Sequence, residues 1–62
     1  MCPFESARKR NIIVVFEDLG SSVKGLYYAR FRQKYIVINS QVEQEQQRSA
    51  CAHVLSHGGI AV

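Results

Sequence analysis

The segment KYIVINSQVEQEQQRSACAHVLSH, residues 34–57, contains the change of pattern that decides the fold. Its first residues are β-branched and aromatic over the length of a strand, and from residue 41 helix-forming residues follow without Gly or Pro. Asn39 and Ser40 lie between the two parts, and both residue types cap helices. We therefore expect a strand at residues 35–38, followed by a helix that one of these two residues caps and that stops at Gly58.

The upstream segments complete an order of helix, strand, strand, strand and helix. Residues 3–10 (PFESARKR) predict a short helix, with Pro early and basic side chains at its end. Residues 11–16 (NIIVVF) predict a strand, and residues 26–30 predict another, joined to residues 35–38 by a tight turn. The expected fold class is α+β, with a small three-stranded sheet packed by the C-terminal helix. Its expected core residues are Ile13, Val15, Tyr27, Ile36, Ile38, Cys51 and Leu55.

Length and composition predict a single small domain, residues 1–62, in a reducing compartment. The chain has a net charge of +3, and its two cysteines form no CxxC pair. The longest apolar run, residues 12–16, is too short to span a bilayer, and the charged N-terminus lacks the apolar core of a signal peptide. We expect a cytoplasmic protein with free thiols and no membrane contact.

The stretch AHVLSH, residues 52–57, is the part of the chain that suggests chemistry. His53 and His57 are four residues apart in the expected helix, so their imidazoles share a face and can reach one metal ion. Val54 lies on the flank where a zinc protease carries its general base, and a hydrocarbon cannot accept a proton from a metal-bound water. The spacing alone also fits two ordinary histidines near a helix C-terminus, where the helix dipole favours them.

The order of these motifs, from about Ala7 to His57, resembles the ImmA/IrrE family of zinc-dependent peptidases. The segments that carry the resemblance are GLYY, the strand KYIVINS, the polar run QVEQEQQR and ACAHVLSH. The family has AHELGH in the last of these. The resemblance therefore implies that His53 and His57 are zinc ligands, and that Val54 replaces the catalytic glutamate and Ser56 the glycine. It also implies a zincin-like fold and a role in phages, integrative elements or stress responses, where a helix-turn-helix repressor is cleaved to relieve repression.

The departures from the family pattern predict a protein without catalysis. The family's third metal ligand comes from a helix after the HExxH helix, whereas only five residues follow His57 here, and none is His, Asp, Glu or Cys. We therefore expect a truncated or degenerate zincin-like domain that holds zinc weakly at His53 and His57. Val54 occupies the general-base position, and no catalytic residue is expected. The expected partner is a helix-turn-helix repressor.

Two alternatives from other classes stay open at this point. One is a nucleic-acid-binding module, indicated by ARKR at residues 7–10 and by the alternation of Arg30, Arg32 and Lys34 with aromatic or polar residues. It is the weaker alternative, because such charges also keep an exposed hairpin soluble and no helix-turn-helix or RNP signature is present. The other is a protein-interaction module, in which the scaffold binds a repressor or forms a homodimer after the loss of catalysis.

Overall fold

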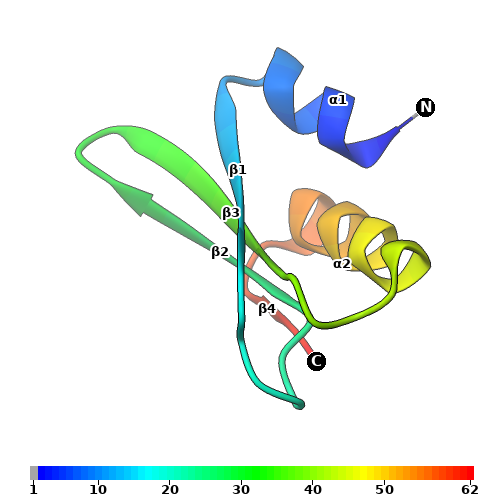
Figure 1. Ribbon diagram of the computed structural model, residues 1–62. Helices are drawn as coiled ribbons and strands as arrows, with labels where there is room; N and C mark the ends of the chain where they lie inside the picture. Colours follow the sequence, from blue (N-terminus) through cyan, green and yellow to red (C-terminus); the bar gives the residue numbers. More distant parts are fainter. Residues whose placement is uncertain (1) are drawn as a thin grey trace.

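The computed structural model describes residues 2–62, which form two helices and a four-stranded sheet (Figure 1). The predicted α+β class is confirmed, but the sheet has four strands in place of the three expected. This additional strand is β4, which is two residues long and follows Gly58 and Gly59, so it has no sequence signature of its own. The elements in chain order are α1 (Pro3–Lys9), β1 (Ile12–Glu17), β2 (Gly25–Arg30), β3 (Gln33–Asn39), α2 (Gln44–His57) and β4 (Ile60–Ala61).

The strands lie in the order β1-β3-β2-β4, so that β3 is an inner strand of the sheet. It pairs in parallel with β1 and in antiparallel with β2, and β2 pairs in antiparallel with β4. The register places Ile36 of β3 between Val14 of β1 and Tyr27 of β2. Because neighbouring residues at the same level of a sheet point to the same side, this register fixes which side chains share a face.

Both helices lie on the same side of the sheet (Figure 1). The core therefore forms between the helices and one face of the sheet, and it takes alternate residues from each strand. Val14 and Tyr27 are partly buried against this core. Within residues 2–62, neither helix has the length and apolar character needed to cross a bilayer. The buried core residues are Ala7, Ile12, Ile36, Ile38, Ala50, Cys51, Val54 and Ala61.

The expected core is confirmed at some positions and wrong at others. Ile36, Ile38 and Cys51 are fully buried, while Tyr27 and Leu55 are partly buried against the core. Ile13 and Val15 were expected in the core, but both point to the face of the sheet opposite the helices. Ile13 is 44% exposed, and Val15 lies outside the core cluster. The physical reason is that β1 is apolar on both sides, so its sequence does not reveal which side meets the helices.

Asn39 and Ser40 were expected to cap the second helix, and this prediction is wrong. Helix α2 begins at Gln44, and its N-cap residue is Glu43, whose side chain makes no capping hydrogen bond. Asn39 instead ends β3, where it is completely buried. The helix therefore starts three residues later than the sequence pattern indicates.

The side chain of Asn39 holds the connection between β1 and β2. Its amide nitrogen donates to the carbonyl oxygens of Gly20 and Val23, at 2.8 and 2.7 Å. Its oxygen accepts from the backbone N–H groups of Leu19 and Gln41, at 3.3 and 2.9 Å. One buried side chain thus satisfies four backbone groups of two loops that have no regular secondary structure.

Gly25, the glycine of GLYY, sets how closely α2 approaches the sheet. It is buried, and a Cβ placed on it would lie 3.2 Å from the Cβ of Ala50 and 3.3 Å from Cδ1 of Ile38. The contact of a glycine with an alanine lets the helix backbone lie close to β2. This close packing positions the turns of α2 that carry the two histidines.

Candidate metal site

His53 and His57 lie in the last two turns of α2, on its exposed side. Their ring centroids are 5.3 Å apart, and the ring planes are inclined by 55°. The helix therefore brings the two predicted ligands together, as the four-residue spacing requires. Both residues are exposed, and a pair of histidines at this spacing can bind a metal ion from solution.

Val54 lies in the core rather than beside the two imidazoles on the surface. Its side chain is 2% exposed and belongs to the same cluster as Ala50 and Cys51, the other buried residues of α2. The buried stripe of the helix therefore passes through the position where the family carries its glutamate. In this chain that position stabilises the fold by apolar packing, and it offers no proton acceptor to the histidine side.

The donor groups fit a zinc ion only in part. Two imidazoles supply half of a tetrahedral shell, and water would complete it. Across residues 2–62, no group of three or more His, Cys, Asp or Glu side chains is arranged to hold a metal. Within residues 2–62, His53 and His57 therefore remain the candidate ligands.

A shallow hollow of about 250 Å³ adjoins His53. Lys24 contributes to its wall, and an ammonium group there opposes the approach of a divalent cation. The sequence analysis did not single out Lys24, because it lies in the loop before β2, where no pattern reveals its neighbour on a distant helix. The hollow is lined by Lys24, Ser49, Ala50, His53, Ile60, Ala61 and Val62.

The two cysteines do not extend the donor set. Cys51 is completely buried, and this burial raises the pKa of its thiol from 9.0 to about 11, with a smaller contribution from Cys2. The Cys51 thiol is therefore protonated at neutral pH, whereas a metal requires the thiolate. Cys2 is exposed at the start of α1. Both thiols are free, as the sequence predicts.

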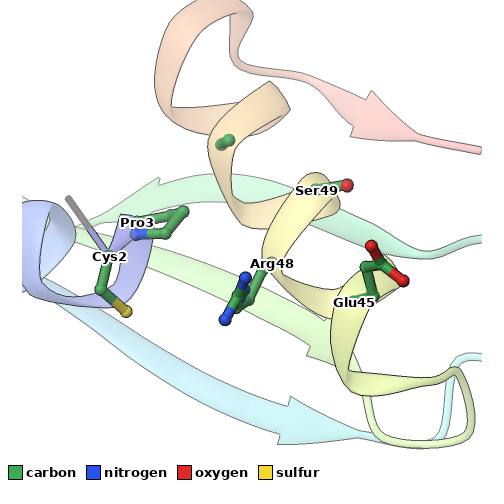
Figure 2. Close-up of a pocket in the computed structure, with 6 residues that line it drawn as sticks. Cys2, Pro3, Glu45, Arg48 and Ser49 are labelled. Atoms are coloured by element: carbon green, nitrogen blue, oxygen red, sulfur yellow. The ribbon is translucent and has the colours of Figure 1, made fainter.

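A larger hollow, of about 530 Å³, lies where the start of α1 approaches α2 (Figure 2). Neither histidine lines it. In the close-up, Cys2 and Pro3 come from the N-terminal segment, while Glu45, Arg48 and Ser49 project from α2. No motif in the sequence pointed to this hollow, because it arises from the packing of two helices that are distant in the chain.

Together these features define a class of protein: a small α+β domain whose last long helix carries an HxxxH pair, as in zincin-type metallopeptidases. The model of the IrrE N-terminal-like domain, a peptidase family, matches residues 7–61. The chain belongs to this family, which confirms the resemblance seen in the sequence.

One similar protein comes from a bacteriophage. The chain is 40% identical over 58 residues to immunity region protein 2 of Bacillus phage phi105. The matched part covers 94% of this chain but 37% of the phage protein, so the chain spans little more than a third of its relative's length. No solved structure matches the chain.

Proposed function

We propose that this chain is a non-catalytic member of its peptidase family, which binds a helix-turn-helix repressor without cleaving it. The observation that carries the proposal is the burial of Val54. This residue stands where the family has its catalytic glutamate, and it is 2% exposed within the core. Replacement of the base by a packed hydrocarbon removes the proton acceptor that a metal-dependent peptidase needs.

The size of the expected defect follows from the role of a general base. Zinc held by the two imidazoles would supply Lewis-acid activation of a water, and a neighbouring base would be needed to accept the proton of that water. Loss of the residue that takes the proton costs about 10²- to 10⁴-fold in rate. His53 and His57 still offer two imidazoles, so the proposal includes weak zinc binding at the surface of α2.

The biological setting of the proposal comes from the relative. A phage immunity region protein is similar to 94% of this chain, and this similarity supports a role in the regulation of a phage or another mobile element. The family is linked to repressors with a helix-turn-helix. A scaffold that keeps its fold but lacks the base could still recognise such a repressor and could retain it or protect it from cleavage.

A binding titration tests this function. A fluorescently labelled helix-turn-helix repressor from a phage immunity region is titrated with the protein, and anisotropy is recorded with zinc and with a chelator. We expect saturable binding in both conditions and an intact repressor at the end of the titration. His53→Ala serves as the matched variant, since it removes a metal ligand at the surface without touching the core. Absence of binding in all conditions would refute the repressor as the partner.

A further inference from the structure

The face of the sheet opposite the helices has an apolar surface that no other element of residues 2–62 covers (Figure 1). Its residues alternate with those that enter the core, so the strand register identifies them. We name this surface the open face. It consists of Ile13, Val15, Leu26, Tyr28, Tyr35 and Val37.

The open face is ordered and continuous across the three long strands. Val37 of β3 lies between Val15 of β1 and Leu26 of β2. It is only 8% exposed, although it is not part of the core on the helix side of the sheet. Tyr28 and Tyr35 are directly opposed across β2 and β3, and their rings stack at a centroid distance of 4.9 Å. Such an apolar sheet surface stays in water only at a cost in free energy.

The two ends of the open face carry opposite charges. Glu17 follows Val15 by two residues and pairs with Asn39, so it lies at the end of the sheet where β1 and β3 finish. Arg30 follows Tyr28 by two residues and pairs with Gln33, at the hairpin end. Because alternate residues share a face, Glu17 and Arg30 flank the same apolar surface from opposite ends.

We propose that the open face is a homodimer interface, at which a second copy of the chain packs face to face with its strands antiparallel to those of the first. A twofold axis that runs across the strands, within the interface, brings the hairpin end of each copy over the acidic end of the other. The same surface then serves both partners, as a twofold interface requires. The two sheets form a sandwich with a spacing of about 10 Å, and their apolar side chains interdigitate.

The charge pattern fits a second copy of the chain in the antiparallel orientation. Parallel packing of two copies would place like charges together, whereas antiparallel packing matches each basic end with an acidic end. Burial of the open face adds a thermodynamic reason, because a second copy would remove its apolar side chains from water. This interface uses neither the histidines nor the hollow beside them.

Sedimentation equilibrium of the full chain tests the interface, with variants whose side chains are exposed in the monomer. We expect a monomer–dimer equilibrium, and Ile13→Lys should shift it to monomer because the ammonium would be buried in the interface. The matched control is Phe16→Lys. Phe16 is on the same strand and 50% exposed, but its ring lies toward Phe4 of α1 on the helix side. Circular dichroism confirms that each variant remains folded.

A charge exchange tests the antiparallel arrangement itself. Glu17→Lys and Arg30→Glu should each weaken dimerisation about tenfold at low salt, because the twofold axis repeats each contact. The two changes together should recover most of the affinity. Lys9→Glu, on α1, should leave the equilibrium unchanged. A monomer up to about 1 mM, a dimer that Ile13→Lys does not affect, or a double variant as weak as the single ones would each overturn the proposal.

Discussion

Val54 lies inside the core while His53, the residue before it, lies exposed on the surface of α2. In an HExxH enzyme the first histidine is a metal ligand, and the glutamate that follows it is the general base. Here Val54 packs in the core, whereas His53 is exposed to solvent on α2. The valine at position 54 therefore stabilises the fold, and replacing it by a carboxylate has a cost in stability.

Replacing Val54 by glutamate should destabilise the protein rather than restore activity. A carboxylate in this apolar cluster has no partner, so its pKa rises and its ionised form costs about 3 to 5 kcal/mol at neutral pH. The raised pKa means that this loss is absent below about pH 4 and grows as the pH rises through neutrality. Urea denaturation of Val54→Glu at pH 4 and pH 7 measures it. Ser56→Glu, at an exposed position of the same helix, should change stability by less than about 0.5 kcal/mol.

Zinc should bind weakly and should require both histidines. His53→Ala and His57→Ala should each abolish the calorimetric signal, because a single imidazole leaves most of the metal's coordination shell to water. Cys2→Ala is the control for an exposed thiol that could bind zinc on its own. Tight binding that survives both histidine substitutions would show that the metal lies elsewhere.

Asn39 should contribute more to stability than any other polar side chain tested by alanine substitution. Asn39→Ala removes four hydrogen bonds to backbone groups of the two loops, and we expect a loss of about 2 to 4 kcal/mol. Gln33→Ala is a suitable comparison, because its side-chain hydrogen bonds are exposed and should contribute less than about 1 kcal/mol. Thermal denaturation of both variants measures the difference, and equal melting temperatures would contradict this role of Asn39.

Substitutions in the hairpin turn between β2 and β3 should increase the stability of the protein. Phe31 and Arg32 have φ angles of 52° and 66°, in the region that favours Asn and Gly, and Phe31 is 87% exposed. Replacing them by Asn and Gly should raise the free energy of unfolding by about 1 to 2 kcal/mol. The opposite change, Gly20→Ala, tests the same effect, since φ is 81° there and a Cβ would meet no neighbour. It should destabilise by about 1 kcal/mol. An Asn-Gly turn that lowers the melting temperature would indicate that the contact of the Arg30 guanidinium with the Phe31 ring, 5.1 Å from the ring centroid, outweighs the relief of backbone strain.

The comparison of sequence with structure shows which signals are local. The spacing of His53 and His57 predicts their proximity, because a helix fixes the geometry between residues four apart. The β-branched and aromatic runs predict three strands, because strand propensity is also a local property of the sequence. The orientation of Ile13 was not predictable, since an unbroken apolar run lacks the alternation that marks a buried side. β4 exists only through its pairing with Gly25 and Leu26, and this contact depends on the completed sheet.

Asn39 shows the limit of reading a residue by type. Its position before a polar helical segment is typical of a helix cap. Its side chain instead bonds to the loop from β1 to β2, and the sequence does not show that this loop passes beside it. The burial of Val54 also could not be inferred from the residue type alone. The sequence shows a valine where the family resemblance calls for a carboxylate, but only the packing of α2 against the sheet shows that this position is part of the core.

The most direct test of the central claim is intact-mass spectrometry of a helix-turn-helix repressor after incubation with this protein and zinc. A family member that carries the glutamate of HExxH serves as the positive control under the same conditions. We predict that the repressor keeps its full mass with this protein, because Val54 provides no general base. Zinc-dependent fragments that disappear with His53→Ala would contradict the account, since they would show that the two histidines support catalysis without a carboxylate at position 54.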